Sequence, residues 1–67
     1  MKPADIRICN ADTGEVFLNG KEAEQYCRFI GYHDAQRGAI TQCAMNNANK
    51  PEGARLSRRY GIAWNIV

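Results

Sequence analysis

The stretch from Asp12 to Ala23 constrains the fold of this 67-residue chain most, because a turn, a strand and a helix start follow one another in it. Thr13–Gly14 predicts the turn, since glycine tolerates a positive φ. Val16–Leu18 is a short run of strand-forming residues. Asn19 stands three residues before Glu22, which is the spacing of a capping box at a helix N-terminus.

The flanking residues extend this order of elements. Ile6–Cys9 alternates and predicts a strand that pairs with residues 16–18 as a hairpin. A helix is predicted from about Gly20 to Ile30, with one apolar stripe made of Ala23, Tyr26, Cys27 and Ile30. Gly31 is well placed to end this helix in a left-handed conformation.

A second helix is predicted over about residues 35–46, with Asp34 as its N-cap. Its inner stripe is expected to hold Ala39, Ile40, Cys43 and Ala44. Gly38 costs about 1 kcal/mol relative to alanine inside a helix. It therefore indicates either a close approach to the first helix or a helix that begins only after residue 38.

The last stretch, Arg58–Val67, alternates and predicts a strand. The element order is then strand, strand, helix, helix, strand. This order predicts an α+β fold, a small ββααβ domain with a three-stranded antiparallel sheet packed on two helices. The residues expected at the centre of its core are Trp64, Tyr60, Phe17, Ile40 and Ile30.

The length allows a single domain, residues 1–67, with a loose start at residues 1–5. No cofactor is expected, because a chain this short has a small core and cannot also enclose a cofactor pocket, which typically needs roughly 300–1,000 Å³. Cys9, Cys27 and Cys43 lack the spacing of metal ligands, so no metal site is predicted and buried free thiols are expected. The alternative, a nucleophilic pair of one cysteine with His33, has no spacing that supports it.

The charge distribution is uneven, although the net charge is only +2. Residues 34–67 carry five Lys or Arg against two Asp or Glu, whereas residues 1–33 carry four against five. The second helix is predicted to expose residue types that read base edges, namely Gln36, Arg37, Thr41, Gln42 and Asn46. Two helices with such a face are typical of a helix-turn-helix, and an ordinary solvated helix face is the alternative.

A basic group follows this helix and consists of Lys50, Arg55, Arg58 and Arg59. Beside a recognition helix, these side chains would hold phosphates without reading sequence. The alternatives are a solubilising loop or the protection of a sheet edge. The residues therefore predict a protein that binds double-stranded DNA by placing its second helix in the major groove.

No catalytic motif is present, so the protein is predicted not to be an enzyme. Glu22 and Glu24 lie two residues apart on a helix and do not face each other. The second predicted function is an inhibitor or adaptor that binds a host protein complex. Its interface would hold Phe29, Tyr32, Asn46 and Asn47.

The chain also resembles the NUMOD-type modules, small DNA-binding units appended to homing endonucleases and found in phage proteins. The similar residues are Thr13–Phe17, Asn19–Ala23, Gly31 and Gly61–Trp64, with Ile40 as the helix centre. Glu24 departs from the family's small residue, and the segment 32–37 is longer than its usual joint. The resemblance implies a phage or mobile-element protein whose DNA-facing residues include Arg37, Thr41 and Gln42.

No apolar run approaches the roughly 20 residues that span a bilayer. Met1–Asp5 also lacks the apolar segment of a signal peptide. We therefore expect a cytoplasmic protein without a membrane partner. An exposed edge of the final strand would allow two copies to pair as a homodimer.

Overall fold

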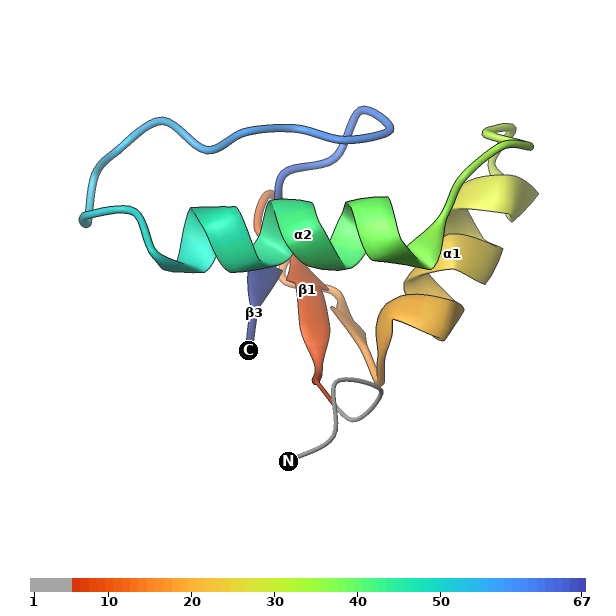
Figure 1. Cartoon of the computed structure of the whole chain (residues 1–67), viewed down its shortest axis with the longest axis horizontal. Helices are drawn as coiled ribbons and strands as arrows, with labels where there is room; N and C mark the ends of the chain where they lie inside the picture. Colours follow the sequence, from red (N-terminus) through yellow and green to blue (C-terminus); the bar gives the residue numbers. More distant parts are fainter. Residues whose placement is uncertain (1–5) are drawn as a thin grey trace.

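The computed structural model describes residues 6–67 and contains two helices and a three-stranded antiparallel sheet with the strand order β2-β1-β3 (Figure 1). The elements are β1 (Ile8–Asn10), β2 (Val16–Phe17), α1 (Gly20–Phe29), α2 (Arg37–Ala48) and β3 (Trp64–Ile66). The predicted α+β class and ββααβ order are confirmed. The prediction of a loose start at residues 1–5 lies outside the described residues.

The β1–β2 hairpin forms where the sequence predicts it, with Ile8 opposite Phe17. Its turn is closed by Asn10, whose carbonyl accepts the N–H of Gly14 at 2.7 Å and whose side-chain oxygen accepts the N–H of Asp12 at 2.9 Å. Gly14 has a φ of +81°, a conformation that glycine adopts at little cost. Pairing of β1 with β3 places Ile8 opposite Ile66.

The two helices pack on the same face of the sheet, α2 on β3 and β1 and α1 on β2 (Figure 1). Between these layers lie Trp64, Ile8 and Ile40, all fully buried, together with Phe17. The rings of Phe17 and Trp64 meet edge to face, with their centroids 5.6 Å apart. Tyr60 lies at the rim of this core, where it is half-buried.

Helix α1 begins and ends at local signals in the sequence. The side chain of Asn19 accepts the N–H of Glu22 at 3.1 Å, so the predicted N-cap is confirmed. After the helix, Gly31 has a φ of +117°, and the N–H of Tyr32 donates to the carbonyl of Cys27 at 2.9 Å. This pattern is a Schellman motif, which satisfies carbonyls that the helix leaves free.

The prediction that Ile30 lies at the centre of the core is wrong, because its side chain is 43% exposed. The apolar stripe of α1 is buried only where the helix crosses the sheet, at Ala23 and Cys27. The last turn of α1 projects beyond the sheet (Figure 1). Ile30 continues the apolar stripe of Ala23 and Cys27, but the sheet does not extend far enough to cover it.

Helix α2 begins two residues later than predicted, and Asp34 is not its N-cap. The N-cap is Gln36, whose side chain makes no capping hydrogen bond. Tertiary partners satisfy the first donors instead: the N–H of Gln36 donates to the Tyr60 hydroxyl at 3.0 Å, and the N–H of Arg37 donates to Oε1 of Glu24 at 2.8 Å. Long-range contacts therefore set this helix start.

The final strand is much shorter than the predicted Arg58–Val67. Tyr60 and Gly61 both have positive φ values, 54° and 72°, and form a two-residue turn between Arg59 and Ile62. Such a turn reverses the chain and ends any strand that would run through it. Ile62, Ala63 and Trp64 are consecutively buried, so the alternation in the sequence does not describe which side chains face inward.

Candidate nucleic-acid interface

Helix α2 has one buried face and one exposed face. Its buried residues are Ile40, Cys43, Ala44 and Asn47. On the opposite side, Gln42, Met45 and Asn46 are exposed to solvent. No residue of α2 is acidic, and Arg37 is its only charged residue. The exposed face is therefore polar, uncharged at its centre and free of carboxylates.

A groove of about 330 Å³ runs along one side of this face, between α2 and the first turn of α1. We call it the α1-side groove, and it is lined by Asn19, Gly20, Lys21, Arg37, Gly38, Thr41, Gln42 and Met45. The helices approach closely at Gly20, where an added Cβ would lie 2.7 Å from Oγ1 of Thr41. Because Gly20 has no side chain, α1 and α2 approach closely at the groove that Lys21 and Arg37 both line.

A second groove of about 290 Å³ runs along the other side of α2. We call it the loop-side groove, and it is lined by Ala39, Gln42, Cys43, Asn46, Ser57, Arg58 and Arg59. Gln42 lines both grooves and therefore stands on the ridge between them. Among residues 6–67, no carboxylate lines either groove, and each groove is lined by two cationic side chains.

The buried amide of Asn47 holds the wall of the loop-side groove against α2. Its Oδ1 accepts the N–H of Ser57 at 2.8 Å. Its Nδ2 donates to the carbonyls of Ser57 at 2.8 Å and Trp64 at 2.7 Å. Because Asn47 is only 3% exposed, these bonds are shielded from water. They fix the segment that carries Arg58 and Arg59.

The prediction that Asn47 belongs to a partner interface is contradicted by this burial. Asn46 is exposed as that alternative requires and lies near the C-terminal end of α2, but Phe29 is the last residue of α1 and Tyr32 precedes the start of α2. Phe29 is 88% exposed, whereas Tyr32 packs on the ring of Tyr60 with 5.5 Å between centroids. The structure does not bring the four predicted interface residues together.

The four cations of the two grooves differ in how strongly they are engaged. Arg58 forms a two-pronged ion pair with Asp12, with nitrogen–oxygen distances of 2.7 and 3.3 Å. This hydrogen bonding lowers the pKa of the Asp12 carboxyl. Nε of Arg37 lies 3.8 Å from a carboxylate oxygen of Glu24. Within residues 6–67, no carboxylate lies within ion-pair distance of Lys21 or Arg59.

Two other predicted phosphate contacts lie farther along the loop. Nζ of Lys50 donates to the carbonyl of Arg55 and to Oγ of Ser57, both at 2.9 Å. The ammonium group of Lys50 therefore links the two ends of the 50–57 loop and stabilises its conformation. Arg55 is exposed, and its backbone carbonyl supplies the bond that orients Lys50.

Of the predicted DNA-facing residues, the structure brings Arg37, Thr41 and Gln42 together along α2 and sets Arg58 and Arg59 beside them. Gln36 is exposed at the start of α2, where its backbone bonds to Tyr60. Lys21 also lines the α1-side groove, although it was not among the predicted DNA-facing residues. The signal that could have found it is the N-cap at Asn19, which places residue 21 in the first turn of a helix.

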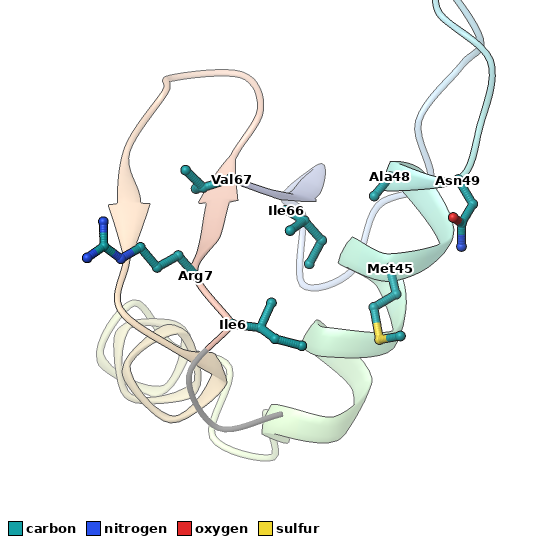
Figure 2. Close-up of a pocket in the computed structure, with 7 residues that line it drawn as sticks. All are labelled: Ile6, Arg7, Met45, Ala48, Asn49, Ile66 and Val67. Atoms are coloured by element: carbon teal, nitrogen blue, oxygen red, sulfur yellow. The ribbon is translucent and has the colours of Figure 1, made fainter. Parts of the chain in front are cut away.

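A third and larger groove, of about 710 Å³, lies between the C-terminal half of α2 and β3. It is lined by Ile6, Arg7, Met45, Ala48, Asn49, Ile66 and Val67. Figure 2 shows that Ile6, Met45 and Ile66 point into this space, whereas the guanidinium of Arg7 points away from it. Three apolar side chains therefore face this groove, and its one cationic lining residue, Arg7, directs its charge elsewhere.

The outer edge of β3 is already engaged within the chain. The carbonyl of Trp64 accepts from Asn47, and the N–H of Ile66 donates to Oδ1 of Asn65 at 2.8 Å. Strand pairing with a second copy through this edge would have to break these two bonds. The predicted homodimer therefore cannot use the Trp64 carbonyl or the Ile66 N–H as they stand.

The three cysteines are free, as predicted, with Cys27 and Cys43 buried and Cys9 half-buried. Burial raises the pKa of the Cys27 thiol, which disfavours the reactive thiolate. In the described part of the chain, no three His, Cys, Asp or Glu residues are grouped so that they could hold a metal ion. Over the same residues, neither helix is both long enough and apolar enough to cross a bilayer.

No known protein family, curated protein or solved structure matches this chain. The similarity of residues 13–23 and 61–64 to NUMOD-type modules therefore stays a prediction from the sequence.

Proposed function

We propose that this protein binds double-stranded DNA by inserting the exposed face of α2 into the major groove. The observation that carries the proposal is the composition of that face. Amide side chains occupy its centre, two cations line each flanking groove, and no carboxylate lines either groove in residues 6–67. Amides pair with base edges, and cations pair with phosphates.

The dimensions of the helix support this placement. An α-helix with its side chains is about 10–12 Å across, and the major groove is about 12 Å wide. A helix seated there has a phosphate backbone on each side. Lys21 and Arg37 would face one backbone, and Arg58 and Arg59 would face the other.

Affinity should come chiefly from the cations that no carboxylate neutralises. Lys21 and Arg59 are free to contact phosphate without breaking an ion pair within residues 6–67. Arg59 lies with its guanidinium carbon 5.5 Å from the ring centre of Tyr60, which restricts its motion. Arg58 must exchange its bond to Asp12 for a bond to phosphate.

The test is a salt titration of binding to a duplex, measured by fluorescence anisotropy. Arg59→Gln should reduce the slope of log K against log salt by roughly 0.9, the value for one phosphate contact. Arg7→Gln is the matched control, because its guanidinium points away from α2 (Figure 2). Absence of binding by the wild type at low salt would contradict the proposal.

A second candidate function, recognition of a protein, is favoured by one observation. Phe29 is 88% exposed at the end of α1, whereas Phe17 in the core is 7% exposed. An exposed aromatic side chain of this kind is typical of a protein-binding surface. Phe29→Ala should then abolish retention of a host protein that the wild type retains after nuclease treatment. It should leave duplex binding unchanged, because Phe29 lines neither groove beside α2.

A further inference from the structure

Two amide side chains at the centre of the exposed face are joined to each other. Nε2 of Gln42 donates to Oδ1 of Asn46, one helical turn later, at 3.0 Å. The bond leaves Oε1 of Gln42 as an unpartnered acceptor group and Nδ2 of Asn46 as an unpartnered donor group, while Nε2 of Gln42 keeps one further N–H. If both amides were turned over, one acceptor and one donor would again be free. The pair therefore presents one group of each kind in either orientation.

This combination discriminates between base pairs in the major groove. Adenine presents one donor, N6, and one acceptor, N7, which match a free acceptor and a free donor. Guanine presents two acceptors, N7 and O6, and is read best by a side chain with two donors, such as arginine. The only arginine of α2 is Arg37 at its first residue, away from the centre of the face.

Apolar atoms lie on both sides of the amide pair. Met45 is 43% exposed and lines the α1-side groove with Gln42. Ala39 lines the loop-side groove with Gln42 and Asn46. The partner of adenine, thymine, carries a methyl group in the major groove, and apolar side chains contact it favourably.

We infer that α2 reads A·T base pairs in the major groove, with Gln42 and Asn46 on adenine and Met45 or Ala39 against the thymine methyl. This inference rests on the proposed function, since it assigns a base preference to the same helix face. Gln42 and Asn46 are then the specificity-determining residues, and the flanking cations supply affinity for any sequence.

The experiment compares duplexes of equal length at one low salt concentration: A·T only, G·C only, and A·T with 7-deazaadenine in place of adenine. 7-Deazaadenine lacks the N7 acceptor but leaves base pairing and the minor groove intact. The wild type should bind the A·T duplex at least about fivefold more tightly than either of the others. Replacing thymine by uracil should weaken binding by a smaller factor.

The double variant Gln42→Ala/Asn46→Ala should bind the A·T and 7-deazaadenine duplexes equally, because neither amide remains to donate to N7. Gln25→Ala is the matched control, because Gln25 is an exposed glutamine of α1 that lines neither groove. It should keep the wild-type preference. Equal wild-type affinity for all duplexes, or a preference that the double variant retains, would overturn this inference while leaving DNA binding intact. Failure to bind any duplex would overturn the proposed function itself.

Discussion

The two sides of α2 present similar charges on very different supports. In the α1-side groove, Lys21 and Arg37 belong to helices, and these helices touch at Gly20. In the loop-side groove, Arg58 and Arg59 belong to an irregular segment that the buried amide of Asn47 fixes. One side therefore depends on backbone packing and the other on a hydrogen-bonded side chain. Each support can be removed separately.

The largest expected effect is on the loop side. Asn47→Ala removes three hydrogen bonds to backbone groups and leaves the N–H and carbonyl of Ser57 and the carbonyl of Trp64 without this partner. We expect the free energy of unfolding to fall by about 3 kcal/mol, since each unsatisfied buried group costs roughly 1–3 kcal/mol. Urea denaturation measures this change.

Asn46→Ala is the matched control for Asn47→Ala. The side-chain amide of Asn46 is exposed, and within residues 6–67 it bonds only to Gln42. Its free energy of unfolding should change by less than about 0.5 kcal/mol. Equal stability losses in the two variants would show that Asn47 is not the support of the loop side.

The next effect concerns the α1 side and compares two glycines. In Gly20→Ala the new Cβ meets Oγ1 of Thr41 at 2.7 Å, so we expect a loss of about 1–3 kcal/mol in the free energy of unfolding. In Gly38→Ala the Cβ meets nothing within 4 Å, and α2 should gain up to about 1 kcal/mol. Thermal unfolding of both variants, and of Gly20→Ala with Thr41→Ala, separates the steric cause from helix propensity.

A smaller effect distinguishes the cations of the loop side. Asp12→Asn releases Arg58 from its ion pair, so DNA affinity should rise about two- to fivefold, corresponding to the free energy of an exposed pair. Glu15→Gln changes the net charge equally in the same turn, and Glu15 forms no ion pair within residues 6–67. If both variants bind DNA equally well, the ion pair with Asp12 does not compete with phosphate for Arg58.

The smallest effect is a dependence of stability on acid. Because the hydrogen bond from Arg58 lowers the pKa of Asp12 below its ordinary value of 3.8, the folded state favours the ionised carboxyl. The stabilisation is complete above that ordinary pKa and is lost as pH falls through the lower folded value. The difference in unfolding free energy between wild type and Asp12→Asn should therefore shrink below about pH 4. A difference that stays constant down to pH 2, about two units lower, would contradict this linkage.

The sequence predicts the first half of the molecule well because its signals are local. The turn at Gly14, the N-cap at Asn19 and the helix end at Gly31 each depend on neighbours within a few residues. Such signals act wherever the chain is, so reading them requires no knowledge of the tertiary structure.

The second half depends on contacts between distant residues, and there the sequence predicts a second helix and a final strand but misplaces the start of α2 and the extent of β3. The first N–H groups of α2 donate to the side chains of Tyr60 and Glu24, which lie far away in the sequence. No local sequence pattern predicts these two hydrogen bonds. Asn47 resembles its exposed neighbours in a run of asparagines, and only the fold turns it inward. The loop-side cations were predicted by their charge, whereas the residue that positions them was assigned to the surface.

The most direct test of the central claim is a titration of the ¹⁵N-labelled protein with duplex DNA, followed by amide chemical shifts. We expect the largest changes at Lys21, Gly38, Gln42 and Arg59, and little change at Cys9, which lies in β1. Changes concentrated on the sheet, with α2 unaffected at saturating DNA, would contradict it.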